Sequence, residues 1–155
     1  MHGNKLDEID IKILNLLQQD ARIGVSRIGR IVGLSDTPVA NRIEKMEEAG
    51  IIKRYVTLLD REKTPQPVMV ILLVKLKDPN TLLFNNFEQL VTAMPEVQSC
   101  LLISGNWNFL LQVTAATPQA YAVWIMEKIL CHPFIADVES AYLMKECKTF
   151  GGIGL

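Results

Sequence analysis

Residues 25–50 read VSRIGRIVGLSDTPVANRIEKMEEAG, and this stretch predicts two short helices joined by a tight turn. Such a turn requires a residue that can adopt a positive φ, and Gly33 lies at this position. Ser35 is a favourable N-cap for the second helix, and Gly50 is a natural stop after it. Two helices joined by a glycine-containing turn are typical of the helix-turn-helix, whose second helix enters the DNA major groove. The alternative is a helical hairpin that only packs.

A further helix is predicted just before this pair. Asp7 is a favourable cap for it, and Asp10 suits the positive end of the helix dipole. Apolar residues recur at helical spacing in all three predicted helices, so we expect one shared core. Its predicted members are Ile9, Ile13, Leu17, Ile28, Val32, Leu34, Val39 and Ile43. Residues 1–50 are therefore predicted to form a three-helix, winged-like helix-turn-helix domain.

The next predicted region, residues 51–67, leaves this domain as a strand followed by a linker. Residues 51–59 have the composition of a β-strand. Residues 60–67 read DREKTPQP, and their charges and two prolines indicate a domain boundary.

Residues 68–155 are predicted to form a second domain with the element order β-α-β-β-α-β. The strands are predicted over residues 68–77, 97–104, 109–114 and 138–146, and the helices over residues 81–94 and 117–131. This is the order of a ferredoxin-like α+β fold, in which both helices cover one face of four antiparallel strands.

The predicted strands are apolar at consecutive positions rather than at alternate ones. Val68–Val74 is apolar throughout, and Leu101–Ile103 does not alternate either. Continuous apolar strands indicate burial on both faces, whereas the helices of this fold cover only one. We therefore expect a second subunit to bury the other face, and a closed two-fold dimer is the simplest arrangement.

Charge and composition narrow the class of protein. The net charge is only −1, but seven basic and four acidic residues lie between Arg22 and Arg54, against five basic and seven acidic residues after residue 63. The basic excess thus falls on the predicted DNA-binding part. No apolar run is long enough to span a bilayer, and residues 1–20 lack the layout of a signal peptide. We expect a cytoplasmic protein with no membrane partner.

No catalytic or metal site is visible in the sequence. The three cysteines are far apart and form no CxxC motif, and the chain has only two histidines. Neither a Ser-His-Asp arrangement, a P-loop nor a GxGxxG fingerprint is present. We therefore expect no enzyme activity, no metal and no cofactor.

Six short motifs follow one another along the chain. They are LDEID (6–10), DARI (20–23), VGLS (32–35), EEAGII (47–52), MPEV (94–97) and Gly105-x-x-x-Phe109. In this order and with these gaps, the chain resembles the Lrp/AsnC (feast/famine) family of transcriptional regulators. The resemblance implies a DNA-binding helix-turn-helix followed by a ferredoxin-like domain called RAM. In this family that domain dimerises, often assembles into octamers, and binds small effectors, commonly amino acids, between subunits.

The front part of the second helix of the pair is predicted to contact double-stranded DNA. The candidate contacts are Thr37, Pro38, Asn41, Arg42, Lys45 and, toward the phosphates, Arg54 with Lys53. A solvated surface is the alternative for each. For Arg42, an ion pair within the helix is a poor explanation, because its i+3 and i+4 neighbours are Lys45 and Met46.

Two departures from the family pattern fall in this helix. The family often reads Ser-Pro-Ser-Pro at its start and carries two arginines further on. Here Asp36 brings a negative charge near the DNA-facing end, and Asn41 precedes Arg42. An asparagine pairs with adenine where an arginine favours guanine or phosphate, so the operator sequence does not follow from relatives.

The candidate effector-binding residues lie in one turn and one later strand. They are Gly105, Asn106, Trp107, Asn108 and Asp137. An ordinary β-turn is the alternative for residues 105–108. The family often has an aspartate where Asn108 stands, which leaves the identity of the effector open. By family analogy, residues 134–137 of a neighbouring subunit form one wall of the effector site.

Two other functions remain as alternatives. One is a ligand-binding or assembly module that has lost DNA binding, which retention on operator beads would distinguish. The other is an enzyme like the sirohaem decarboxylases, whose architecture is similar but whose arginine- and histidine-bearing motifs are missing here.

Overall fold

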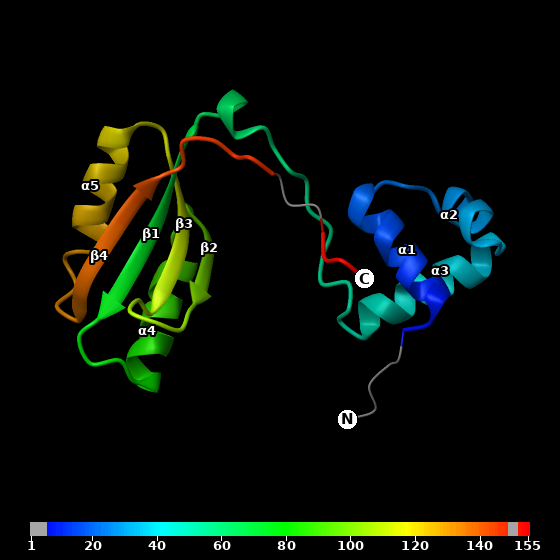
Figure 1. Ribbon diagram of the computed structural model, residues 1–155, viewed down its shortest axis with the longest axis horizontal. Helices are drawn as coiled ribbons and strands as arrows, with labels where there is room; N and C mark the ends of the chain where they lie inside the picture. The colour runs from blue at the N-terminus through cyan, green and yellow to red at the C-terminus, as the bar shows by residue number, and fades with distance from the viewer. Residues whose placement is uncertain (1–5, 149–151) are drawn as a thin grey trace. The chain divides into compact units, whose positions relative to one another are not determined.

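The computed structural model describes residues 6–148 and 152–155. Its internal contacts divide the chain into two units, one formed by Met1–Leu58 with Cys147–Leu155 and the other by Leu59–Glu146 (Figure 1). Residues 147–155 therefore group with the first unit, whereas the sequence-based boundaries place them in the second. Among the described residues, no helix is long and apolar enough to cross a membrane.

The first unit contains the three predicted helices. They are α1 (Glu8–Gln19), α2 (Val25–Val32) and α3 (Asp36–Glu48). Gly33 adopts φ 76° between α2 and α3, as the predicted tight turn requires. Ser35 occupies the N-cap of α3, although its side chain makes no capping hydrogen bond. The helix-turn-helix prediction is confirmed.

One apolar cluster holds the three helices together. Its buried members are Ile13, Leu14, Ile28, Val39 and Met46. All eight residues predicted for this core belong to the cluster, some of them partly buried. At the start of α1, Asp7 accepts hydrogen bonds from the N–H groups of Ile9 and Asp10, and the Asp10 carboxylate accepts from the N–H of Asp7. This reciprocal capping box defines where α1 begins.

The strand predicted over residues 51–59 is wrong, because no residue of this described stretch forms strand pairing. A strand needs a partner for its backbone groups, and this segment has none among residues 6–148 and 152–155. Ile52 packs against the core of the helices, whereas most of the other apolar side chains are exposed, with Leu59 at 74%. The linker that follows contains one short 3-10 helix, η1 (Arg61–Lys63).

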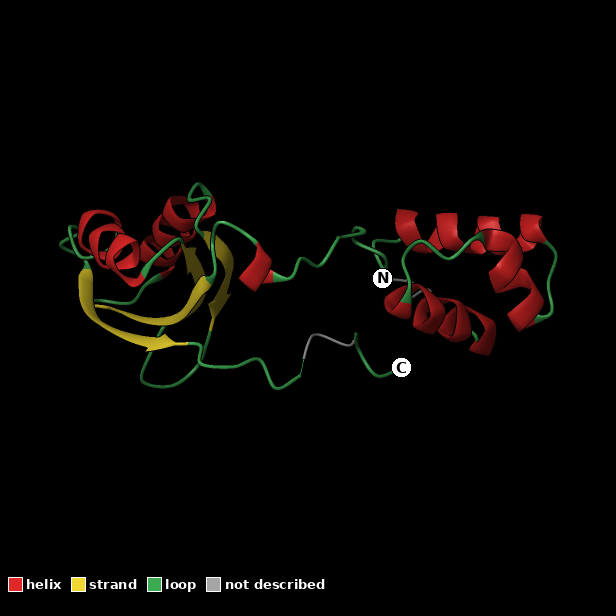
Figure 2. Cartoon of the chain, turned by 90° about the horizontal axis from the view of Figure 1, so that it is seen from above, coloured by secondary structure: helices red, strands yellow, loops and turns green. Residues whose placement is uncertain are grey.

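The second unit has the predicted β-α-β-β-α-β order. Its elements are β1 (Val68–Leu76), α4 (Thr81–Thr92), β2 (Val97–Leu102), β3 (Phe109–Ala115), α5 (Pro118–Lys128) and β4 (Ile135–Tyr142). The strands lie in the order β2-β3-β1-β4 and all pairs are antiparallel. Both helices cover the same face of this sheet (Figure 2). The ferredoxin-like α+β prediction is confirmed.

The last strand starts and ends earlier than predicted. The sequence places it over residues 138–146, whereas β4 covers Ile135–Tyr142. Ile135 pairs with Leu76 and is buried, so pairing starts there, and Tyr142 pairs with Val70 close to the opposite end of β1. The partner strand thus sets the bounds of β4.

Burial along β1 separates the two faces of the sheet. Val70, Leu72 and Val74 are buried beneath the helices, whereas Ile71 and Leu73 lie on the opposite face and are only partly buried in the single chain. We call this opposite side the open face.

The open face carries a row of leucines across three strands. Leu73 pairs with Leu110 on β3, and Leu110 pairs with Leu101 on β2. Residues paired across strands lie on the same face. The consecutive apolar positions noted in the sequence are therefore split between a core and an uncovered apolar surface.

Candidate DNA-binding and effector sites

A groove of about 470 Å³ brings together most of the predicted DNA contacts. It lies between the start of α1 and the front of α3, and its lining residues are Leu6, Asp10, Thr37, Pro38, Asn41, Arg42, Lys45 and Met46. Five of the residues predicted to contact DNA are among them, namely Thr37, Pro38, Asn41, Arg42 and Lys45. Arg54 lies in the loop after α3 and does not line this groove.

The exposed side of α3 carries polar residues at helical spacing. Val39 and Met46 lie on the side of α3 that is buried in the core, while Thr37, Asn41 and Lys45 are exposed. These three recur at i, i+4 and i+8, so they lie on one side of α3. An asparagine and a lysine presented in this way suit base edges and phosphates.

Arg42 lies between two acidic side chains of α1. Its Nη1 is 2.7 Å from Asp7 Oδ2 and 2.7 Å from Asp10 Oδ1. The sequence offered no partner within α3, and it did not reveal these two, because they precede Arg42 by more than 30 positions. The available signal was the pair of acidic residues in the capping box. The three formal charges sum to −1, which offsets the attraction of Arg42 for a phosphate.

The pKa values of this cluster favour the charged pair. The backbone N–H of Asp10 and then the Arg42 guanidinium lower the pKa of the Asp7 carboxyl. Hydrogen bonds to Asp10 and Asp7 raise the pKa of Arg42. Arg42 therefore joins α3 to the start of α1 as an ion at neutral pH.

Asp36, which departs from the family pattern, has a hydrogen-bond partner within the helix-turn-helix. Ser26 Oγ on α2 donates a hydrogen bond to Asp36 Oδ2 in the first turn of α3. A carboxylate at this end of a helix is favoured by the dipole. Asp36 thus connects the two helices of the helix-turn-helix.

The loop that carries Lys53 and Arg54 is anchored to α3 by Tyr55. Its hydroxyl donates to Glu47 Oε1 over 2.7 Å. Burial, followed by the hydrogen bond and the negative charge of Glu47, raises the pKa of Tyr55 to about 12. The phenol stays protonated at neutral pH and remains a donor, which holds the neighbouring Arg54 near the end of α3.

The predicted effector turn is fastened to the end of β1 by Asn108. Its side-chain Oδ1 accepts from the N–H of Leu76 over 2.8 Å, and its own N–H donates to the carbonyl of Val74 over 2.9 Å. An aspartate would also supply that acceptor, so the departure at Asn108 keeps this hydrogen bond. Gly105, at φ 121°, and Asn106 are exposed, and Trp107 is half-buried.

Asp137 lies at the same end of the sheet as this turn. It pairs with Lys75 in the register of β4 with β1, and its Oδ1 accepts from the N–H of Val138 over 2.9 Å. Since β3 and β4 flank β1 on its two sides, Asp137 and the start of β3 lie two strand spacings apart, roughly 10 Å. One chain thus places all five candidate effector residues around the end of β1.

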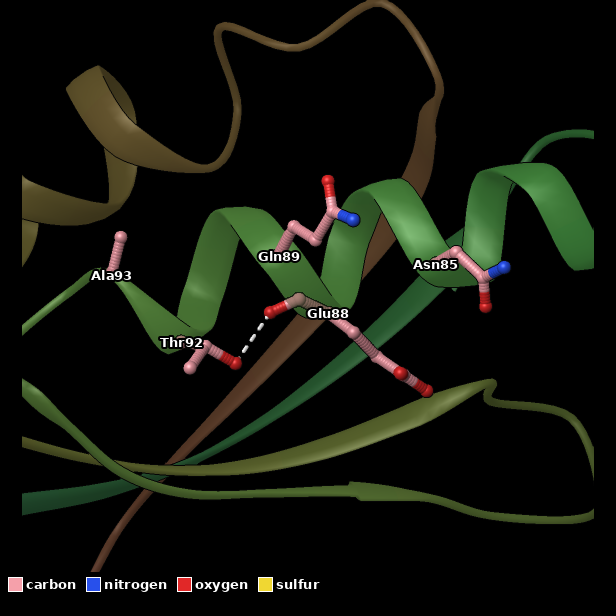
Figure 3. A pocket seen from close by; sticks show the side chains of 5 residues that line it. All are labelled: Asn85, Glu88, Gln89, Thr92 and Ala93. Atoms are coloured by element: carbon pink, nitrogen blue, oxygen red, sulfur yellow. Dashed lines mark hydrogen bonds between the residues drawn. The ribbon is translucent and has the colours of Figure 1, made fainter.

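On the second unit, a hollow of about 550 Å³ lies along α4. Figure 3 shows its lining residues Asn85, Glu88, Gln89, Thr92 and Ala93. The Thr92 hydroxyl donates to the carbonyl of Glu88 over 2.7 Å. This hollow contains none of the candidate effector residues.

Both units match known protein families. Residues 6–47 match the AsnC-type helix-turn-helix domain, and residues 69–153 match the Lrp/AsnC ligand binding domain. The chain belongs to the Lrp/AsnC family. It is therefore an Lrp/AsnC-type DNA-binding transcriptional regulator with a ligand-binding domain, and the members of this family are regulators rather than enzymes.

Several relatives share nearly the whole chain with this Lrp/AsnC regulator. The leucine-responsive regulatory protein of Haemophilus influenzae is 34% identical over 92% of this chain and 86% of its own. A transcriptional regulator of Neisseria meningitidis, solved with L-Met, superposes with a TM-score of 0.90 at 29% identity and covers 97% of each chain. An AsnC family regulator from Agrobacterium tumefaciens has a TM-score of 0.87 at 34% identity, with 96% of this chain and 97% of that chain covered.

Proposed function

We propose that this regulator contacts its operator through Thr37, Pro38, Asn41 and Lys45 on α3, with Arg54 on a flanking phosphate. The observation that carries the proposal is the exposed polar side of α3, whose residues line the 470 Å³ groove. For Arg42, two ion pairs on α1 favour a positioning role over the direct contact expected from the sequence.

A gel shift with duplexes from the protein's own promoter region tests these contacts. Lys45→Ala should weaken binding on all sequences and reduce the slope of log K against log salt by about 1, because one phosphate contact is lost. Asn41→Ala should relax the preference at one base pair, costing about 1–3 kcal/mol on the preferred site. Lys128→Ala on α5 is the control. Equal binding by wild type and both α3 variants at several salt concentrations would refute these contacts. Absence of binding by wild type would favour an assembly module without DNA binding.

We infer that the open face is covered by a second copy of the chain in a homodimer, from which octamers can assemble. The support is the apolar row of Leu73, Leu101 and Leu110, with Leu101 at 54% exposure in the single chain. In a dimer, two recognition helices would enter successive major grooves about 34–36 Å apart.

Leu110→Lys tests the dimer because it places a charge in the middle of the open face. We expect wild type to sediment as a dimer or larger in analytical ultracentrifugation at micromolar concentration, and the variant to shift toward monomer. Leu82→Lys, at an exposed leucine on α4 (68%), is the matched control and should keep the dimer. A wild-type protein that sediments as a clean monomer would contradict this inference.

We further propose that the ligand is a small molecule such as an amino acid, bound at the turn 105–108 with Asp137. Support comes from the shared position of these residues at the end of β1, and from the relatives that are named leucine-responsive or solved with L-Met. A ligand that binds one arrangement of subunits better than another would shift assembly or DNA binding.

A thermal-shift screen against the common amino acids tests this ligand. A ligand present at 100 times its Kd should stabilise the protein by about 2.7 kcal/mol, which raises Tm by several degrees. Asn106→Ala and Asp137→Ala should abolish the shift, whereas Asn86→Ala on α4 should keep it. An undiminished shift in both site variants would place the ligand elsewhere.

A further inference from the structure

The side chain of Gln18 on α1 pairs with the backbone of Ile153 in both directions. Gln18 Nε2 donates to the Ile153 carbonyl over 3.1 Å, and the N–H of Ile153 donates to Gln18 Oε1 over 2.5 Å. A glutamine amide carries one acceptor and two donors in a plane, so it can replace a neighbouring peptide group. This is the pairing that two backbone segments make in a sheet, here made by a side chain of a helix.

Gly152 makes this approach possible. Its φ is 89°, a conformation that other residues rarely adopt. A Cβ added there would lie 2.4 Å from Gln18 Oε1 and 3.1 Å from Gln18 Cβ. Gly154 differs on both counts, because it has no positive φ and no atom within 4 Å of an added Cβ. Only the first of these two glycines is required by the contact.

The surface around this contact is polar. A hollow of about 360 Å³ is lined there by Asn15, Gln18, Gln19, Lys148 and residues 152–154. Residues 147–155 group with the first unit, so the chain passes between the two units twice, once after Leu58 and again after Glu146.

We propose that residues 152–155 dock on α1 and form a second connection between the ligand-binding unit and the DNA-binding unit. Because the segment is part of the same chain, its effective concentration at α1 is high, and few hydrogen bonds suffice to keep it bound. Two connections restrict the positions of the DNA-binding unit more than residues 59–67 do alone. The second connection begins after Glu146, four residues beyond the end of β4.

The regulatory consequence rests on the proposed function. Asp137, a candidate effector residue, lies on β4, and the chain that leaves β4 ends on α1. A ligand that shifts β4 therefore acts on the helix-turn-helix through this docked segment as well as through the linker. Docking itself does not depend on DNA or on a ligand, so it is tested separately.

Amide hydrogen exchange of the full-length protein tests docking without DNA or ligand. We expect the N–H of Ile153 to be protected in wild type and to exchange about tenfold faster or more in Gly152→Ala and Gln18→Ala, which lose its acceptor. Gly154→Ala is the matched control and should keep wild-type protection. An unprotected Ile153 in wild type, or equal protection in Gly152→Ala, would overturn the proposal.

Distances between spin labels test the second connection. Labels at Glu48→Cys on α3 and Lys128→Cys on α5, with the native cysteines replaced by alanine and the sample diluted with unlabelled protein, report the separation of the units. Gly152→Ala should widen the distance distribution, and Gly154→Ala should not. An unchanged distribution in Gly152→Ala would refute the connection, even if the gel shift supports the DNA contacts.

Discussion

Gly29→Val is expected to destabilise the DNA-binding unit by about 3 kcal/mol and to abolish operator binding at the same protein concentration. Gly29 lies in α2 where that helix contacts the turn, and a Cβ added there would lie 2.5 Å from the carbonyl oxygen of Leu34. The obstacle is backbone rather than the end of a flexible side chain, so α2 and α3 must move apart. This movement also disturbs the contact of Ser26 with Asp36.

Thermal or urea unfolding followed by circular dichroism measures the loss in Gly29→Val. Gly24→Val is the matched control, because nothing lies within 4 Å of a Cβ at Gly24. Gly24 is the N-cap of α2, where valine in place of glycine costs about 1 kcal/mol or less. If both variants unfolded at the same denaturant concentration, the close approach at Gly29 would not be a constraint.

Arg42→Met is expected to lower both the stability of the helix-turn-helix and its affinity for DNA, while leaving the salt dependence of binding unchanged. Removing the guanidinium leaves Asp7 and Asp10 without their cation. The Arg42 side chain is 31% exposed and that of Asp7 is 50% exposed, so solvent screens these ion pairs and the loss is closer to that of a surface pair than to that of a buried one. Asp10→Asn in the Arg42→Met background should restore part of this loss by removing one of the two like charges.

The pH dependence provides a second measurement of the same contact. The pKa of Asp7 is lowered in the folded protein, so the pair stabilises the fold above the usual carboxyl pKa, and this stabilisation is lost as the pH falls through the folded value. Arg42→Met should therefore flatten the acid dependence of stability. A direct phosphate contact would give the opposite pattern, with a salt slope smaller by about 1 and near-wild-type stability.

The local elements of this protein follow from its sequence. Gly33 is needed where the turn between α2 and α3 has positive φ, and Asp7 with Asp10 forms the cap of α1. Apolar residues at helical spacing indicated the core of the first unit, and the β-α-β-β-α-β order indicated the sheet. These features depend on neighbours within a few positions, so a pattern in the sequence is sufficient to predict them.

The features that the sequence did not reveal depend on residues far apart in the chain. Arg42 has its partners on α1, Asn108 holds the N–H of Leu76, and Gln18 binds Ile153. The predicted strand over residues 51–59 has no partner strand in the part of the chain that the structure describes, and β4 takes its bounds from β1.

Secondary-structure propensity and hydrophobic periodicity act over a few residues, whereas ion pairs, hydrogen bonds and strand pairing need two segments to meet. The kind of elements, their order and the family pattern could therefore be predicted from short stretches of the sequence. The packing of α3 against α1 sets which polar residues on α3 remain exposed and which, like Arg42, join two helices, because it brings together residues more than 30 positions apart.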